Sequence, residues 1–201
     1  MTDMVHILRA SLPAAFALSL VSCADSTAPY APDDPRLFRA VAVGSGHTCG
    51  INADGQLLCW GRNQDGQLGD GTYDSRVFPM PVAGNLTFTS VSAYASNTCG
   101  VTDDGTAYCW GSNYFGQLGN GTDSSHATPT PVNASNIAFG AISAGGVRTC
   151  GLALDGTAYC WGLGPLGNGT EDTVAVPVEV DGAIRFSSLS AGESHTCGVA
   201  R

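Results

Sequence analysis

The sequence predicts an all-β fold made of β-propeller blades that form an open or partial ring. The first observation behind this prediction is an internal repeat of about 50 residues, a period typical of a solenoid, a propeller or an array, and it is marked by phenylalanines at Phe38, Phe88, Phe139 and Phe186. The second is the local pattern, because short apolar runs bounded by glycine and Asp-Gly signals are typical of strands joined by tight turns. The third is composition, since glycine contributes 27 of the 201 residues and proline only 10. Four short strands in each repeat would make one blade.

Residues 1–22 precede the repeats and are typical of a signal peptide of the lipoprotein type. Arg9 comes before an apolar run at 12–21 that is too short to span a bilayer. The run ends in a motif that resembles a bacterial lipobox, so Cys23 is the expected lipidation site. The alternative is a plain signal peptide with an unmodified cysteine. Residues 23–37, rich in proline and small polar residues, are expected to be a disordered tether. We therefore expect an exported, membrane-anchored lipoprotein that faces the periplasm or the cell surface.

The rest of the chain divides into three repeats and a partial fourth, at 38–87, 88–138, 139–185 and 186–201. Each contains a Thr-Cys-Gly triplet at the same distance from its phenylalanine, and the first three continue with Asp-Gly and Cys-Trp-Gly. The first two then show Gly-Gln-Leu-Gly-x-Gly-Thr, at 66–72 and 116–122. The third repeat is shortened after its tryptophan, which accounts for its shorter period. The three tryptophans are expected to pack between blades, because they recur at one repeat position; a carbohydrate platform is the alternative.

Cysteine spacing predicts the register of one hairpin in each full repeat. Opposed residues of an antiparallel hairpin keep a constant sum of residue numbers, and an even sum requires a loop with an odd number of residues. Three-residue loops that end in glycine are expected at 53–55, 103–105 and 154–156. This register places each cysteine opposite its partner. It predicts the disulfides Cys49–Cys59, Cys99–Cys109 and Cys150–Cys160, which export to an oxidising compartment would favour.

A metal site built from these cysteines is the competing interpretation. The position of His47 is occupied by Asn97, Arg148 and His195 in the other repeats, and the cysteine spacing is not that of a zinc site. We therefore expect no metal and no cofactor.

Cys197 has no cysteine ten residues further on, so a free thiol is expected. The chain halts inside a motif, which favours a fragment of a longer propeller; the alternative is that two chains complete one ring. Open blade edges would promote self-association, because unpaired strands act as templates for other strands. The 201-residue chain is accordingly expected to be marginally stable.

Charge limits the classes of partner. Acidic residues outnumber basic ones by 17 to 8, which gives a net charge of −9. Nucleic-acid binding and a polybasic membrane contact both need clustered positive charge, so neither is expected. Contact with a membrane is expected only through the N-terminal lipid.

The first repeat closely resembles the regulator of chromosome condensation repeat, through Gly-His-Thr-Cys-Gly-Ile at 46–51, Cys-Trp-Gly-x-Asn at 59–63 and the glycine-rich run at 66–72. The second repeat resembles it equally, while the third loses the asparagine and the glutamine. The resemblance implies about three and a third repeats of a family that forms seven-bladed propellers. Bacterial, secreted, cysteine-paired members look most similar. The family includes an exchange factor for a small GTPase as well as protein-binding scaffolds.

A non-enzymatic module that binds an unknown protein partner is the function expected. No nucleophile or acid–base pair forms a recognisable catalytic motif, so no catalytic residue is assigned. Specificity should lie in loops where the repeats differ, and the candidate binding residues are Arg62, Gln64, Tyr73, Tyr114 and Phe115. Two alternatives stay open: guanine-nucleotide exchange, implied by the resemblance, and an enzyme whose site lies in missing repeats.

Overall fold

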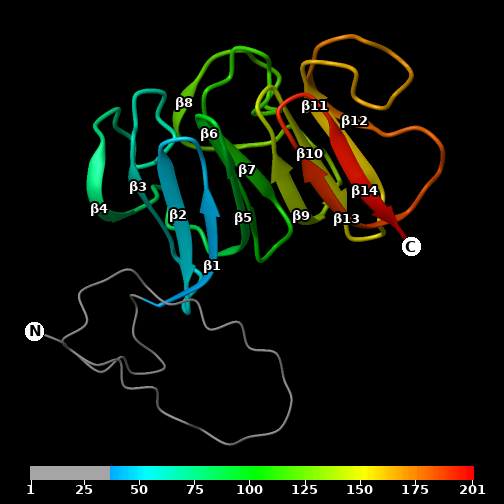
Figure 1. The fold of residues 1–201 in the computed structure, drawn as a ribbon. Coiled ribbons are helices and arrows are strands. Elements are labelled where there is room, and N and C mark those ends of the chain that lie inside the picture. The colour runs from blue at the N-terminus through cyan, green and yellow to red at the C-terminus, as the bar shows by residue number, and fades with distance from the viewer. Residues whose placement is uncertain (1–36) are drawn as a thin grey trace, which may run out of the picture.

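A computed structural model of the protein describes residues 37–201, and every regular element in this range is a β-strand. Three sheets of four antiparallel strands and one sheet of two follow one another along the chain (Figure 1). The first blade consists of β1 (Phe38–Val43), β2 (His47–Asn52), β3 (Leu57–Gly61) and β4 (Arg76–Pro81). The second blade consists of β5 (Phe88–Tyr94), β6 (Asn97–Thr102), β7 (Ala107–Gly111) and β8 (His126–Pro131). The third blade consists of β9 (Phe139–Ala144), β10 (Arg148–Ala153), β11 (Ala158–Gly162) and β12 (Val174–Glu179). A separate half-blade follows, made of β13 (Phe186–Ala191) and β14 (Thr196–Ala200).

The blades stand side by side in an arc. The first strand of each sheet is innermost, since β1 contacts β5, β5 contacts β9, and β9 contacts β13. Figure 1 shows that the half-blade does not return to the first blade, so the arc is open. The predicted all-β fold with propeller blades in an open ring is therefore confirmed. The described residues contain no helix of the length and hydrophobicity needed to cross a bilayer.

Antiparallel order places alternate connections on opposite rims of the arc. The loops at 62–75, 112–125 and 163–173 join the third and fourth strands of their blades and lie on one rim, which we call the upper rim. In Figure 1 this rim is at the top. The Asp-Gly hairpins lie on the opposite, lower rim. Residues that vary between the long upper-rim loops are thereby brought to one edge of the molecule.

The predicted hairpin register is confirmed in all three blades, where each cysteine is directly opposite its partner. The structure joins Cys49 to Cys59, Cys99 to Cys109 and Cys150 to Cys160, with 4.1 Å between the Cα atoms of each pair. This short separation is typical of a non-hydrogen-bonded pair in an antiparallel ladder. In the first hairpin the loop is closed by Asn52 N–H, which donates to Gln56 O at 3.0 Å. Gly55 has a φ of 80°, in the left-handed region that glycine tolerates best.

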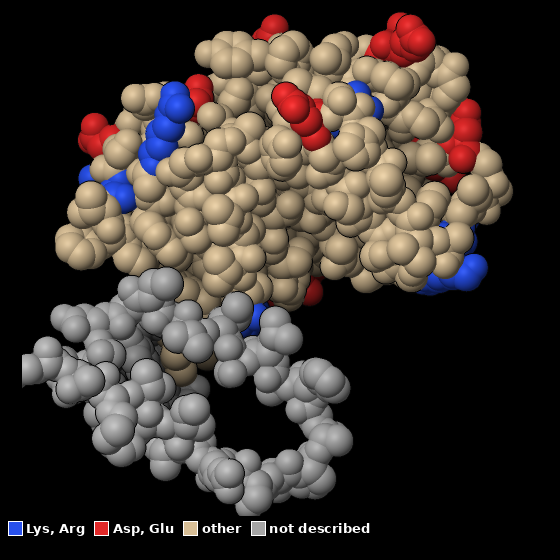
Figure 2. Space-filling view, viewed as in Figure 1, with Lys and Arg blue, Asp and Glu red and all other residues tan. Residues whose placement is uncertain are grey.

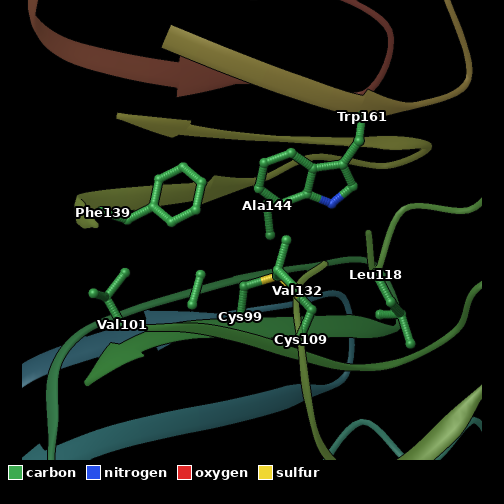
Figure 3. Close-up of a cluster of buried hydrophobic side chains, with 9 residues drawn as sticks. Cys99, Val101, Cys109, Leu118, Val132, Phe139, Ala144 and Trp161 are labelled. Atoms are coloured by element: carbon green, nitrogen blue, oxygen red, sulfur yellow. A yellow bond between two sulfur atoms is a disulfide. The ribbon is translucent and has the colours of Figure 1, made fainter. Parts of the chain in front are cut away.

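Each blade has two faces of different chemistry. One carries the disulfide, and we call it the disulfide face; the other carries the repeated phenylalanine and tryptophan, and we call it the indole face. The indole face of one blade packs on the disulfide face of the preceding blade, as Figure 3 shows for Phe139 and Trp161 over Cys99 and Cys109. The equivalent Phe88 and Trp110 are 1% and 0% exposed on the first blade.

The glycine of each Thr-Cys-Gly triplet makes room for the phenylalanine of its own blade. A Cβ atom at Gly100 would lie 2.6 Å from the Phe88 ring, which is too close for any side chain. Within the triplet, the cysteine therefore forms the disulfide and the glycine leaves space for the phenylalanine ring.

Candidate functional site

The five candidate binding residues lie on the upper rim. Arg62, Gln64 and Tyr73 belong to the loop between β3 and β4, and Tyr114 and Phe115 belong to the loop between β7 and β8. All five side chains are exposed, and Tyr73 and Tyr114 retain 57% and 73% of their accessible surface. Large exposed aromatic residues beside polar loops are typical of protein-binding surfaces.

A buried asparagine holds each of the first two upper-rim loops in shape. Asn63 accepts a hydrogen bond from Leu68 N–H through Oδ1 (2.9 Å) and donates through Nδ2 to Thr72 O (2.9 Å) and Asp74 O (3.1 Å). Asn113 makes the same three bonds in the second blade. Both asparagines are 0% exposed, so their amides replace water for backbone groups that the loop would otherwise leave unpaired. The exposed residues that follow are thus displayed on a fixed backbone.

The glutamine of each of the first two upper-rim loops connects two blades. Its backbone carbonyl, Gln67 O, accepts hydrogen bonds from Thr98 Oγ1 (2.9 Å) and Trp110 Nε1 (3.0 Å) of the second blade. Gln117 O is bound in the same way by Thr149 Oγ1 (2.8 Å) and Trp161 Nε1 (2.9 Å). Trp110 and Trp161 are therefore packing residues that also fix the upper-rim loops to the neighbouring blade.

The glutamine side chains position the candidate residues directly. Gln117 Oε1 accepts a hydrogen bond from Phe115 N–H at 2.9 Å, and Gln67 Oε1 accepts one from Asp65 N–H at the same distance. The buried Gln117 side chain therefore fixes the backbone of Phe115 from inside the loop. Its side chain, at 41% exposed, is left beside Tyr114 on the surface.

The third upper-rim loop is anchored differently, because it lacks the asparagine and the glutamine. Arg148, which is 4% exposed, donates through NH1 to Pro165 O at 2.7 Å and through NH2 to Gly164 O at 3.4 Å. Pro165 stands where Gln67 and Gln117 stand in the other loops. Burial lowers the pKa of Arg148, yet its ordinary value is high enough that the guanidinium keeps its charge.

Acidic side chains dominate the electrostatics of the upper rim. Figure 2 shows a face that is mostly uncharged, with acidic side chains mainly along its upper and right-hand edges. Exposed acidic residues on the upper-rim loops are Asp74, Asp123, Glu171 and Asp172. Asp70 is different, because its Oδ2 pairs with Arg76 Nε at 2.8 Å. Burial alone would raise the pKa of Asp70, but the hydrogen bonds from Thr72 and Arg76 outweigh it and hold that pKa below its ordinary value.

Within residues 37–201 no group of three or more histidine, cysteine or acidic side chains is arranged to hold a metal ion. Two hollows of about 330 and 260 Å³ repeat on the lower rim, between a hairpin tip and the connection to the next blade. The first is lined by Asp104, Val132 and Phe139, and the second by the equivalent Asp54, Val82 and Phe88. None of the five candidate residues lines either hollow.

The architecture defines a repeat propeller protein, and comparison with known proteins supplies the family. Models of the regulator of chromosome condensation (RCC1) repeat match residues 38–67 and 88–117, and also 54–101, 104–152 and 155–199. The chain belongs to the RCC1 repeat family.

Relatives of known sequence and structure agree with this assignment. The chain is 32% identical over 165 residues to the E3 ubiquitin-protein ligase HERC2 of Homo sapiens, which covers 77% of this chain and 3% of that one. Human WBSCR16 superimposes with a TM-score of 0.76 at 25% identity, over 82% of this chain and 46% of that one. Prp20p of Saccharomyces cerevisiae, described with its binding properties to Gsp1p and histones, gives a TM-score of 0.68 at 23% identity, over 82% and 44%. The chain thus spans less than half the length of each of these proteins.

Three features of this region were not predicted from the sequence: the loop-pinning role of Asn63 and Asn113, the burial of His47, and the anchoring role of Arg148. The recurrence of asparagine three residues after the first two of the three Cys-Trp pairs was a signal for the first. Cys23 and the signal segment lie outside the described residues, so their predicted roles stay predictions.

Proposed function

We propose that this protein is a non-enzymatic binding module that recognises a protein partner through the upper rim. The observation that carries the proposal is the contrast within the first two upper-rim loops. Asn63, Asn113 and the two glutamines fix the backbone from inside, while Tyr114 and Phe115 stand exposed at positions where the first blade has Gln64 and Asp65. A rigid frame with variable, exposed aromatic residues suits recognition, because little conformational entropy is lost when the surface binds.

The charge of the rim suggests the chemistry of the partner. The exposed acidic side chains around these aromatics favour a partner face that combines basic side chains with an apolar pocket. Binding of that kind should weaken as salt is added, because the outer charges are screened.

Site-specific photo-cross-linking tests the proposal. A photoreactive residue at position 114 should trap one specific protein from envelope extract. The same residue at position 154 is the matched control, since Leu154 is 67% exposed but lies on a lower-rim hairpin. Equal products from both positions, or none at position 114, would count against recognition through the upper rim.

We also propose that the module is exported and held at a membrane by a lipid on Cys23. The lipobox-like sequence supports this, and so do the three cysteine pairs, since disulfides persist in oxidising compartments.

The anchor is tested by Cys23→Ser. The variant should leave the membrane fraction and lose incorporation of a labelled fatty acid, whereas Cys197→Ser should change neither. A wild-type protein that carries no lipid label and fractionates as the variant does would refute the anchor.

A further inference from the structure

The larger lower-rim hollow, of about 330 Å³, lies in the middle of the arc, where the second blade meets the connection to the third. All of its lining residues fall between positions 104 and 139, so the hollow is formed entirely by two adjoining blades. Much of the lining is apolar, because Ala107, Val132, Ile137 and Phe139 contribute to it. The hollow can therefore bury an aliphatic group of modest size.

One carboxylate lies at the mouth of this hollow. Asp104 is exposed, and its Oδ1 accepts hydrogen bonds from Thr102 Oγ1 at 2.6 Å and from Thr106 N–H at 2.9 Å. These bonds hold the pKa of Asp104 below its ordinary value, so the group is ionised at neutral pH. Within residues 37–201 no salt bridge reaches Asp104, and no basic side chain lines the hollow. A negative charge beside an apolar hollow is thus left without a cation.

The equivalent hollow between the first and second blades has a cation beside it. Asp54 takes the place of Asp104 there. Arg39 Nη2 donates to the backbone oxygen of Phe88, a residue that lines this second hollow, at 2.6 Å. The position of Arg39 is occupied in the second blade by Thr89, which is uncharged. Only the larger hollow therefore lacks a guanidinium of the chain itself.

We propose that the larger hollow binds a lysine side chain of a partner protein. The methylene stem packs on Val132, Ile137 and Phe139, and the ammonium group donates to Asp104 at the mouth. Long basic side chains suit such a place, because they can bury their stems on apolar surface while the charged head stays at the edge of the solvent. This site lies on the rim opposite to the candidate binding residues and adds a second contact surface to the proposed function.

The hydrogen bonds of Asp104 favour lysine over arginine. A guanidinium binds a carboxylate best through two parallel bonds, which require both oxygens. Oδ1 of Asp104 already accepts two hydrogen bonds, which leaves Oδ2 for a ligand. An ammonium group is a compact charge that needs only one oxygen.

The chain cannot supply this side chain itself, because all eight of its basic residues are arginines. The lysine must therefore come from another protein. The net charge of −9 should also draw a basic segment towards the molecule, because long-range attraction raises the rate of encounter.

A peptide titration with matched variants tests the site. The probe is a short fluorescent peptide, blocked at both ends, that carries one lysine between two leucines. The full chain should bind it weakly, and Asp104→Asn should raise the Kd at least about tenfold, because the ammonium loses its charged acceptor. Asp54→Asn is the control and should change the Kd less than about twofold. Asparagine keeps the Oδ1 acceptor for Thr102 and Thr106, and thermal unfolding verifies that both variants fold.

The probe itself is also varied. Norleucine in place of lysine keeps the stem but removes the charge, and it should bind at least about tenfold more weakly. Arginine should bind more weakly than lysine. No binding of the lysine peptide to the wild type, or equal effects of Asp104→Asn and Asp54→Asn, would overturn the proposal.

Carbodiimide cross-linking gives a second measurement, which locates the contact. The reagent joins carboxylates to amines, and a chain without lysine offers no lysine of its own to compete with the peptide. Peptide mapping should place the main link on Asp104. Links spread evenly over the exposed acidic residues would show attraction by net charge alone and would contradict the site.

A partner bound at this hollow should also be detected from position 154. Leu154 N–H donates to the backbone oxygen of Ala138, which lines the hollow, at 3.1 Å. A photoreactive residue at position 154 should therefore trap a product different from the one at position 114, and Asp104→Asn should reduce its yield. A product at position 154 that does not respond to Asp104→Asn would count against the lysine site and leave recognition through the upper rim unaffected.

Discussion

His47 is a buried neutral histidine between the first and second blades. It is 2% exposed, and its Nε2 lies 2.8 Å from Thr98 Oγ1. Thr98 uses its proton to bind Gln67 O, so the histidine must donate from Nε2. Its Nδ1 has no hydrogen-bond partner within the described part of the chain. Burial lowers the pKa of His47 from 6.5 to about 4, because a charged imidazole would lose its hydration here.

This histidine should make the stability depend on pH. The unfolded chain takes up the proton as the pH falls below 6.5, whereas the folded chain resists until about pH 4. The free energy of unfolding should therefore be highest above pH 6.5 and lose up to about 3 kcal/mol between these two values. Urea unfolding at a series of pH values measures the loss.

His47→Asn provides the control for that prediction, since asparagine occupies the same position in the second blade, at Asn97. The variant should lose the part of the pH dependence between pH 6.5 and 4 that His47 causes. Identical pH profiles for the variant and the wild type would show that His47 is not the group responsible.

Trp110 allows one inter-blade hydrogen bond to be removed without removing the ring. Trp110→Phe should destabilise the protein by about 1 kcal/mol beyond the effect of ring size, because Gln67 O loses one of its two donors. Trp60→Phe is the matched change, since Trp60 is half-buried on the open face of the first blade. Urea unfolding that gives equal losses for both would contradict the role assigned to the indole N–H.

At the scale of the element, the disulfide-closed hairpin is the most regular part of the fold. Each pair spans ten residues and joins directly opposed positions of two adjacent strands. The bond restricts the unfolded chain more than the folded one, since the antiparallel ladder already holds the two residues together.

Replacement of one pair should therefore be costly. Cys99→Ser combined with Cys109→Ser should lower the free energy of unfolding by about 3 kcal/mol. Cys197→Ser, at the exposed free cysteine, should change it by less than about 0.5 kcal/mol. Urea unfolding compares the two at one protein concentration, and non-reducing peptide mapping of the wild type should find the three short-range links. A link from Cys49 to Cys99 would be incompatible with the register.

The sequence predicted the hairpins well because their determinants are local. Residue-number parity, the Asp-Gly loop and the cysteine spacing together define the register, and no distant contact is needed. The long loops were harder to predict, because Asn63 bonds to groups five, nine and eleven residues away. Its neighbours in the sequence indicate only a turn. Arg148 was the least predictable, because its partner Pro165 exists only where the third loop is shortened.

The candidate site was predicted as positions but not as a surface. Comparison of the repeats selected Tyr114 and Phe115 because they differ from the corresponding loop of the first repeat, which contains Arg62 and Gln64. Only the strand order shows that both loops share the upper rim. The role of Gln117 in holding the backbone at Phe115 depends on a bond between neighbours whose geometry the sequence does not reveal.

At the scale of the whole molecule, one interface is used repeatedly. The bonds that join the blades, through Gln67 O and Gln117 O, arise in the same loops that display the candidate binding residues. Blade packing and the display of the upper rim therefore depend on each other, and a change confined to the exposed positions should leave the fold intact.

We expect the exposed residues on the pinned loops, and not the frame, to determine binding. Exchange of Tyr114 and Phe115 for the first blade's glutamine and aspartate tests it most directly, with affinity for the cross-linked partner measured by titration calorimetry. The unfolding midpoint should not change, because the frame accepts those residues at the equivalent Gln64 and Asp65. The Kd should rise at least about tenfold, as expected when aromatic anchors are lost. An unchanged Kd in a folded variant would contradict the claim.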